Sequence, residues 1–268
     1  MIITKLQGGL ANQLFQYAYG KFLSEEYSTP LFLDVSFYTN TQFGSTKRNF
    51  SLNNFPNIDY KLVPNEKNIS LWSDEVNKTR FLYLNDNFSY KELKYDDENH
   101  YFLNGYWQSE KYFKKIEDKI RHELSPSIEE LNKLKNIIPD NSVSIHIRRT
   151  DYISSNGYHP VQPISYYEKA LSLIDGYENV IVFSDDIKWC KENLNFKNMI
   201  FIEGYEDYQD LWLMSMCSHN IIANSSFSWW GAWLNNNKDK KVVAPINWFG
   251  EQSGLNSSDI ILENWIKI

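Results

Sequence analysis

The chain has 268 residues, of which 42% are hydrophobic and 23% are charged. This length and composition are those of a folded globular protein with one large domain or two modest ones, and they argue against disorder. The formal net charge of −7 argues against a nucleic-acid partner, because a phosphate backbone attracts a basic face, whereas a small anionic ligand needs only a local positive site.

The cysteines and the N-terminus indicate the compartment. Cys190 and Cys217 are too few for a disulfide framework or a Cys-rich zinc site, which favours a reducing compartment. The first residues enter a glycine-rich turn at once and leave no room for a signal peptide, and no apolar run approaches the ~20 residues of a membrane span. We therefore expect a cytoplasmic protein without a transmembrane segment.

The first 34 residues predict a β-α-β unit. Residues 1–6 have the apolar character of a short strand, and Gly8-Gly9 marks a turn after it. Leu10 and Leu14 then begin a helical repeat of apolar residues, and residues 30–34 are typical of a second strand.

The middle of the chain is less regular. Residues 38–100 carry many Asn, Asp and Tyr residues, and we expect loops and short elements there. A strand is expected at 101–107, followed by two helices within 109–138 that Pro126 separates.

Strands and helices alternate from residue 142 to about residue 245, which predicts a parallel sheet with helices on both faces. Residues 135–141 are typical of a linker, so we expect an N-terminal domain of residues 1–138 and a C-terminal domain of residues 139–268. The expected strands are residues 142–147, 179–183, 199–202, 219–223 and 241–245, and the expected helices are residues 165–174, 207–217 and 228–234.

Polar segments follow three of these strands. They are His146–Asp151, Ser184–Asp186 and Asn224–Phe227. Because ligands of parallel sheets bind at the carboxyl ends of the strands, the three segments together predict one binding site.

The first segment contains an arginine pair. Alternation along the strand turns His146 and Arg148 to the same face. A guanidinium at a strand end can hold phosphate oxygens through two parallel hydrogen bonds. The alternative is a pair of surface arginines with Asp151 as their salt-bridge partner. Since neighbouring arginines usually point in different directions, one of the two would bind the ligand and the other would hold the loop.

The other two segments each allow two interpretations. Asn224-Ser225-Ser226-Phe227 opens a helix, where hydroxyls and backbone N–H groups form an anion site, although one of these residues could simply cap the helix. Asp185 and Asp186 could accept hydrogen bonds from the N–H groups of guanine, or cap a loop or helix. Asp-x-Asp, the spacing with which many sugar transferases hold a divalent ion, occurs nowhere in the chain, so no metal site is expected.

Gly8-Gly9 would let the backbone approach a ligand closely, or would form an ordinary strand-to-helix turn. The chain contains no Gly-x-Gly-x-x-Gly, Walker loop, His-Glu-x-x-His or Gly-x-Ser-x-Gly motif. Their absence argues against a P-loop enzyme, a zinc protease and a serine hydrolase.

Four segments together resemble the bacterial alpha-1,2-fucosyltransferases, which form glycosyltransferase family 11. The segments are Gly8–Tyr17, His146–Tyr152, Phe183–Asp186 and Asn224–Leu234, and they stand in the same order as in that family. One departure is Ala11, where a Gly is usual. The resemblance implies an α/β fold of the GT-B type, with two Rossmann-like domains and a cleft between them.

The resemblance also implies a reaction. It is the inverting, metal-independent and cofactor-free transfer of fucose from GDP-fucose to the 2-hydroxyl of a terminal galactose in a glycan, which can be a lipid-linked repeat unit at the inner membrane face. The C-terminal half would bind the donor and the N-terminal half would face the acceptor. Together with the strand alternation, the resemblance assigns Arg148 to the leaving diphosphate, whose charge it would stabilise, and Arg149 to Asp151 as its structural partner. Asp151 is also the candidate base, and Asn12 would orient the acceptor hydroxyl. The residues expected to bind GDP-fucose are Gly8, Gly9, His146, Arg148, Ser184, Asp185, Asp186, Asn224, Ser225, Ser226 and Phe227.

Two other functions stay open. The donor could be another GDP- or UDP-sugar, which competition by GDP or UDP would distinguish. A non-catalytic carbohydrate-binding protein would use tryptophans such as Trp229, Trp230 and Trp233, but we interpret these three mainly as packing residues.

Overall fold

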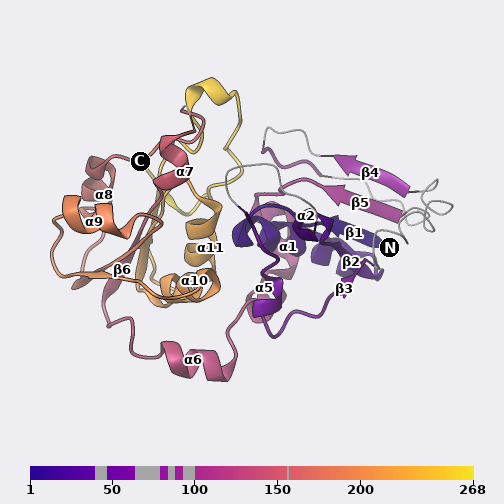
Figure 1. The fold of residues 1–268 in the computed structure, drawn as a ribbon, viewed down its shortest axis with the longest axis horizontal. Coiled ribbons are helices and arrows are strands. Elements are labelled where there is room, and N and C mark those ends of the chain that lie inside the picture. The colour runs from indigo at the N-terminus through magenta and orange to yellow at the C-terminus, as the bar shows by residue number, and fades with distance from the viewer. Residues whose placement is uncertain (40–46, 64–78, 84–87, 93–99, 156) are drawn as a thin grey trace. The chain divides into compact units, whose positions relative to one another are not determined.

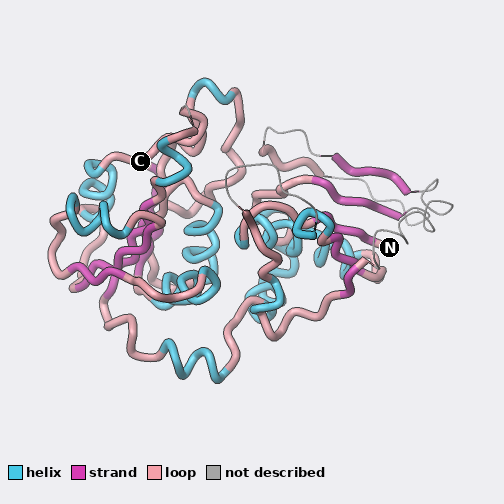
Figure 2. Tube along the Cα trace, viewed as in Figure 1, coloured by secondary structure: helices cyan, strands magenta, loops and turns pink. Residues whose placement is uncertain are grey.

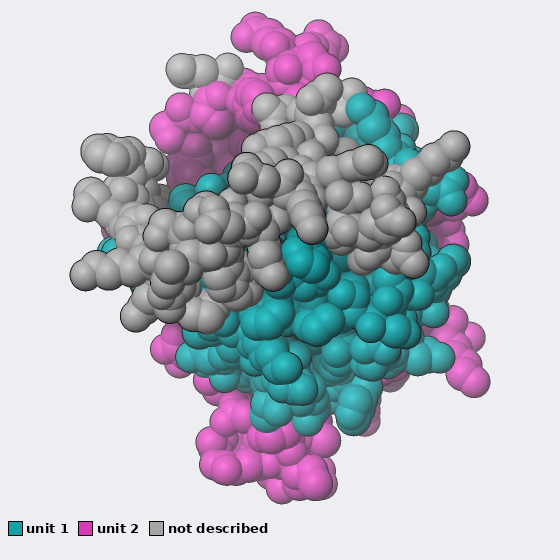
Figure 3. All heavy atoms as spheres, turned by 90° about the vertical axis from the view of Figure 1, so that its right-hand side faces the viewer, with its two compact units in different colours: residues 1–125, 258–260 teal, residues 126–257, 261–268 magenta. Residues whose placement is uncertain are grey.

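The computed structural model describes residues 1–39, 47–63, 79–83, 88–92, 100–155 and 157–268. The chain divides into two compact units, which Figure 3 shows in different colours. Unit 1 comprises Met1–Ser125 and Ser258–Ile260, and unit 2 comprises Pro126–Ser257 and Ile261–Ile268. The late segment belongs to unit 1 because Asp259 accepts hydrogen bonds from Lys111 at 2.6 Å and from the Tyr90 backbone at 2.8 Å.

Unit 1 is built on a parallel sheet with the strand order β3-β2-β1-β5-β4. The chain first adds strands on one side of β1 and later places β5 on the other side, so the winding reverses between β1 and β5. The strands are β1 (Ile2–Lys5), β2 (Leu31–Asp34), β3 (Lys61–Leu62), β4 (Thr79–Tyr83) and β5 (His100–Asn104).

Helix α1 (Leu10–Glu26) forms the core of unit 1. Most of its side chains are buried, and Gly20 lets it lie close to the sheet, since a Cβ there would collide with Thr4 Oγ1. The other helices that the structure describes in unit 1 are short (Figure 2): α2 (Ser36–Thr39), η1 (Leu52–Asn54), η2 (Glu110–Tyr112), η3 (Lys114–Ile116) and α5 (Glu117–Glu123).

Unit 2 has a six-stranded parallel sheet with the strand order β11-β10-β9-β6-β7-β8. The winding reverses between β6 and β9, which is the order of the doubly wound dinucleotide-binding fold. The strands are β6 (Ser142–Ile147), β7 (Asn179–Ser184), β8 (Met199–Phe201), β9 (His219–Ile221), β10 (Val242–Ala244) and β11 (Ile266–Lys267).

Helices cover both faces of this sheet (Figure 1). On one face, Ile145 and Ile147 of β6 share a core with Tyr167 of the second helix after it, α8, and with Cys190. On the other face, Trp229, Trp230 and Trp233 are fully buried, which confirms their interpretation as packing residues. The helices are α6 (Ile128–Leu134), α7 (Thr150–Ile153), α8 (Ile164–Leu171), α9 (Ile187–Asn193), α10 (Asp207–Met216), α11 (Ser226–Leu234) and η4 (Glu251–Ser253).

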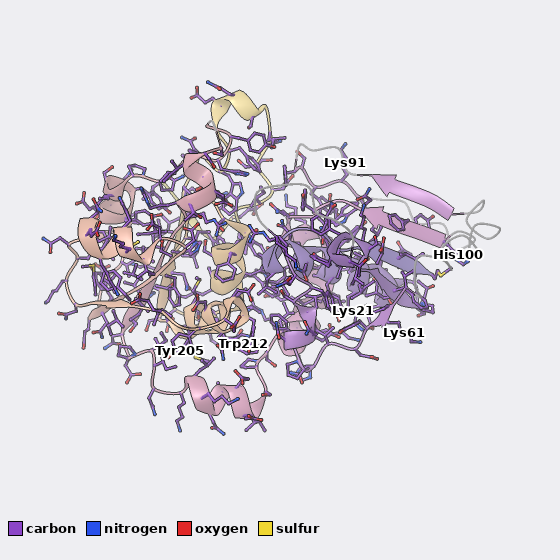
Figure 4. All side chains as sticks on the ribbon, viewed as in Figure 1. Lys21, Lys61, Lys91, His100, Tyr205 and Trp212 are labelled. Carbon is purple, nitrogen blue, oxygen red and sulfur yellow. The ribbon has the colours of Figure 1, made fainter. Side chains whose placement is uncertain are left out.

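The units divide at Pro126, whereas the sequence placed the domain boundary after residue 138. Helix α6 belongs to unit 2, because Gln209 of α10 donates a hydrogen bond of 3.0 Å to Glu130 of α6. Trp212, labelled on α10 in Figure 4, is fully buried in the same unit. Among the described residues, no helix combines the length and the apolar composition needed to cross a bilayer.

Candidate functional site

The three polar segments of unit 2 meet at the carboxyl edge of its sheet. β6 lies between β7 and β9, with Ile147 in register with Ser184 and Ile145 in register with Ile221. The edge between β6 and β9 is the point where the winding reverses, and doubly wound sheets bind their ligands there. The topology therefore selects the neighbourhood of Arg148 and Asn224 as the candidate site.

Arg148 follows β6 directly and is held by two carboxylates. Its Nε and Nη2 donate to the two oxygens of Asp151 at 2.9 and 2.7 Å, and Nε lies 3.3 Å from Asp185. Its guanidinium also lies 5.8 Å from the ring of Tyr152. About a fifth of the side chain (22%) is exposed, so a positioned positive charge faces the carboxyl edge of the sheet.

Arg149 points elsewhere, and its predicted pairing with Asp151 is wrong. Its guanidinium carbon lies 3.6 Å from the centre of the Trp189 ring, and its Nε lies 3.5 Å from Asp186. The next helix requires this, because Arg149 is the N-cap of α7 and its backbone departs from the strand direction. Asp151, three residues beyond Arg148 along α7, is therefore the partner of Arg148.

Asp185 and Asp186 hold the loop after β6. Asp185 accepts hydrogen bonds from the backbone N–H groups of Arg149 at 2.9 Å and Thr150 at 3.2 Å, and from the Thr150 hydroxyl. Asp186 caps α9 by accepting from the Trp189 backbone at 3.2 Å. Ser184 accepts from the Asp186 backbone at 2.9 Å. Asp185 therefore caps the loop after β6 and Asp186 caps α9, as one of the two interpretations of this pair expected.

His146 is a buried neutral histidine beneath this loop. Its side chain packs against the ring of Phe227, with ring centres 5.6 Å apart. Burial, and then the positive charge of Arg148, lower its pKa to about 3. Its Nδ1 is buried and has no hydrogen-bond partner among the described residues.

The segment after β9 forms the opposite wall of the site. Ser225 caps α11 by accepting from the Phe227 backbone at 3.3 Å, so the helix begins at Ser226, two residues earlier than expected. Asn224 is fixed at both ends of its amide, with Gln162 donating to it at 3.2 Å and Trp248 O accepting from it at 2.9 Å. The segment therefore presents the N-terminal end of a buried helix to the edge where Arg148 lies.

The sequence analysis missed two residues that connect these segments. The hydroxyl of Tyr152 donates to the backbone oxygen of Asn224 at 2.8 Å, which joins the loop after β6 to the loop after β9. The ring of Tyr152 stacks on His159, with centres 4.8 Å apart. Burial raises the pKa of Tyr152 well above its ordinary value, so it stays a hydrogen-bond donor. Tyr152 stands in the segment His146–Tyr152, which already pointed to the site, but its hydrogen-bond partner Asn224 is 72 residues away in the sequence.

The N-terminal site residues lie in unit 1 and form a group of their own. Gly8 has a φ of +81°, and a Cβ there would come within 2.6 Å of Asn12 Nδ2. Gly9 caps α1, and a Cβ there would meet the guanidinium of Arg48 at 3.6 Å. Tyr38 donates to Gly8 O at 3.0 Å. The turn is therefore specified by close packing, which requires glycine at position 8.

Two histidines outside the site, His100 and His219, have structural contacts. Nδ1 of His100, labelled in Figure 4, lies 2.9 Å from the N-terminal amine, and His219 accepts from the Lys241 backbone at 3.0 Å. Within the described ranges, no three His, Cys, Asp or Glu side chains are grouped so that they could hold a metal ion. Cys190 and Cys217 are both buried free thiols.

Comparison with known proteins gives consistent results. A family model named Glycosyl transferase family 11 matches residues 63–268. Two Escherichia coli proteins are each 36% identical to the chain. One is an alpha-1,2-colitosyltransferase, aligned over 100% of this chain and 99% of its own. The other is the O-antigen biosynthesis glycosyltransferase WbnK, aligned over 98% of this chain and 99% of its own.

A solved structure shares the fold. Escherichia coli ADP-heptose LPS heptosyltransferase II superposes with a TM-score of 0.53 over 100% of this chain and 89% of its own, at 13% sequence identity. An identity this low is informative about the fold alone. The expected fold class is confirmed: the chain has the α/β fold of GT-B glycosyltransferases, with two units built on parallel sheets.

Proposed function

Because the chain belongs to glycosyl transferase family 11, we propose that it transfers L-fucose from GDP-fucose to the 2-hydroxyl of a terminal galactose, with inversion and without a metal ion. The acceptor we propose is a glycan repeat unit of a surface polysaccharide. The 36% identity of the chain to an O-antigen biosynthesis glycosyltransferase supports this acceptor class.

One observation carries the proposal more than any other. Arg148 stands at the reversal point of the unit 2 sheet, across from the N-terminal end of α11. A guanidinium and a helix N-terminus both attract anions, and the diphosphate of a sugar nucleotide carries the charge that they would neutralise. His146, Ser225, Ser226 and Phe227 would complete this donor site.

The chemistry follows from the charge at that edge. The acceptor hydroxyl attacks the anomeric carbon from the face opposite the diphosphate, a C–O bond forms, the bond to the diphosphate breaks, and the hydroxyl proton is released late in the step to water. Negative charge then develops on the leaving phosphate, where Arg148 would stabilise it. Guanine would lie by the loop after β7, next to Asp185 and Asp186. Asp186 is the carboxylate with the longer contact to an arginine, because Arg149 Nε lies 3.5 Å from it.

Asp151 and Asn12 would orient reacting groups. Asp151 is the carboxylate nearest to Arg148 in the loop, but both of its oxygens accept hydrogen bonds from that guanidinium. We therefore assign Asp151 to the orientation of Arg148. Asn12 of unit 1 would orient the attacking hydroxyl, since an amide can accept or donate a hydrogen bond but cannot take the proton.

The experiment is incubation with GDP-fucose and a panel of galactosides, followed by linkage analysis of the product by NMR. The expected product carries an alpha-fucose at the galactose 2-hydroxyl. Release of free fucose without any glycoside product, or a linkage to another hydroxyl, would contradict the proposal.

A second candidate donor has a specific observation behind it. The alpha-1,2-colitosyltransferase is as similar to the chain as any relative reported above, and colitose is fucose without its 3-hydroxyl. GDP-fucose and GDP-colitose supplied together at equal concentration would separate the two, because the ratio of products gives the ratio of their kcat/KM values. We expect fucose to dominate. A majority of colitosylated product would assign the other donor.

The location is also a proposal. We place the enzyme in the cytoplasm, where GDP-sugars and lipid-linked repeat units are both accessible at the inner membrane face. Fractionation of cells that express the chain at native level would test this, with recovery in the cytosolic or peripheral membrane fraction expected.

A further inference from the structure

Unit 1 has a reversal point of its own, between β1 and β5. β1 and β5 are parallel neighbours, with Thr4 in register with Leu103, so the segments that follow them leave the sheet at the same edge. Ligands of open parallel sheets bind at such an edge. The two segments are the Gly8-Gly9 turn and residues 105–109.

One hydrogen bond joins these segments. Gln108 Nε2 donates to Asn12 Oδ1 at 2.8 Å. Asn12 is confined on its other side by Gly8, whose missing Cβ leaves room for the Asn12 amide. Gln108 is half-buried, and among the described residues its Oε1 and its second N–H have no other partner. The amide of Gln108 is therefore oriented by the protein, with hydrogen-bonding capacity left over.

The backbone before Gln108 is held in an unusual conformation. Trp107 has a φ of +56°, which is an outlier for a bulky residue. Its side chain is 1% exposed and packs on Tyr19 and Tyr112, with ring centres 4.6 and 5.5 Å apart. Strain of this kind persists only where the surrounding packing imposes it, and it is concentrated at sites that clamp ligands. Packing of Trp107 thus fixes the direction in which Gln108 leaves the sheet.

We propose that Gln108 binds the acceptor sugar through two neighbouring hydroxyl groups, and that Asn12 holds its amide in place. The proposal rests on the transferase function given above and names a residue of its acceptor site. A primary amide offers a carbonyl acceptor and an N–H donor, and a hydroxyl can both donate and accept. A hexopyranose with two adjacent free hydroxyls fits this pair, whereas a nucleotide diphosphate requires positive charge.

The test compares Gln108→Ala and Gln108→Glu with Gln209→Ala. Gln209 also donates an amide hydrogen bond to a side chain, but it lies on α10 outside the site residues. Steady-state kinetics should show kcat/KM for the acceptor lowered about tenfold to a hundredfold in both Gln108 variants, because the loss of one or two hydrogen bonds has this magnitude. The KM for the donor should change by less than about twofold. The glutamate variant keeps the shape of the side chain, replaces the N–H donors by a second acceptor oxygen and adds a negative charge, so it guards against a folding defect caused by truncation in the alanine variant.

Deoxygenated acceptors sharpen the test. Wild-type enzyme should lose about the same factor when one contacted hydroxyl is removed from the galactoside, and Gln108→Ala should no longer respond to that removal. Equal losses in donor and acceptor KM, or independent effects of the variant and the deoxygenation, would overturn the assignment.

Acceptor binding without turnover separates this inference from the proposed reaction. A saturation-transfer NMR titration with methyl galactoside should give the same dissociation constant for the wild type and Gln209→Ala, and one about tenfold or more higher for Gln108→Ala. Binding that depends on Gln108 in a protein that transfers no fucose would refute the proposed reaction and support the acceptor site. An unchanged dissociation constant in Gln108→Ala, or the absence of galactoside signals from the wild type, would overturn the site.

Discussion

Arg148 holds Asp151 by two hydrogen bonds, from Nε at 2.9 Å and from Nη2 at 2.7 Å. A planar guanidinium and a carboxylate joined in this way fix each other's orientation. The arginine that we assign to the diphosphate is therefore positioned before any ligand binds, and the carboxylate nearest to it is already engaged.

Asp151→Asn tests the orienting role. An asparagine keeps the shape but can accept only one of the two hydrogen bonds, so we expect kcat to fall about tenfold to a hundredfold, as for the loss of a charged hydrogen bond. The pH dependence of kcat should be the same as in the wild type. If Asp151 were the base, nearly all activity would be lost.

Arg148→Lys tests the phosphate role. Lysine keeps the positive charge but cannot make two parallel hydrogen bonds. We expect kcat to fall by about 10² to 10³, the range for loss of a preorganised contact to developing charge. Arg149→Lys is the matched control: it disturbs the stacking on Trp189 and should lower the midpoint of thermal unfolding more than the rate. Equal effects of the two substitutions on kcat would contradict the division of labour between the arginines.

Removal of divalent ions tests whether arginine takes the place of a metal. After dialysis against EDTA we expect fucose transfer at an unchanged rate, because Arg148 and the N-terminal end of α11 supply the positive potential at the phosphate. The measurement is initial rate with and without added Mg²⁺ or Mn²⁺. A strict requirement for either ion would refute the metal-free mechanism.

Much of this site follows from the sequence, and the part that does not has a physical reason. The expected strands at 142–147 and 179–183 match β6 and β7. β7 has a continuous apolar run, and β6 alternates Val and Ile with Ser and His, which is a period of two. β11 has two residues, too few to show a period. The pairing of Arg148 rather than Arg149 with Asp151 depends on the backbone turn at Arg149. No residue type at this position predicts that turn. The fixed amide of Gln108 depends on a contact across 96 residues.

His146 makes stability depend on pH below neutrality. Its pKa is about 3 in the folded protein and ordinarily 6.5, so between these values the unfolded state binds more protons. The free energy of unfolding should therefore fall as pH decreases from about 6.5, and the fall should be smaller in His146→Gln. Urea unfolding at pH 7.5 and 5.0 measures the difference. The same pH dependence in both proteins would show that folding does not lower the pKa of His146.

Asp210 on α10 produces the opposite pH dependence. Its Oδ1 is buried without a partner among the described residues, and burial, followed by the charge of Asp207, raises its pKa to about 7 from 3.8. Between these values the folded state binds the extra proton, so this carboxyl lowers stability as pH rises through that range.

Asp210→Asn removes the charge at nearly constant shape, so the variant should unfold at a higher temperature than wild type at pH 8 and at a similar temperature at pH 4. Asp207→Asn, an exposed neighbour in the same helix, is the control and should shift the pH 8 midpoint by much less. Thermal melts at the two pH values decide the matter: a stabilisation by Asp210→Asn that is equal at pH 4 and pH 8 would mean that the carboxyl does not titrate in this range.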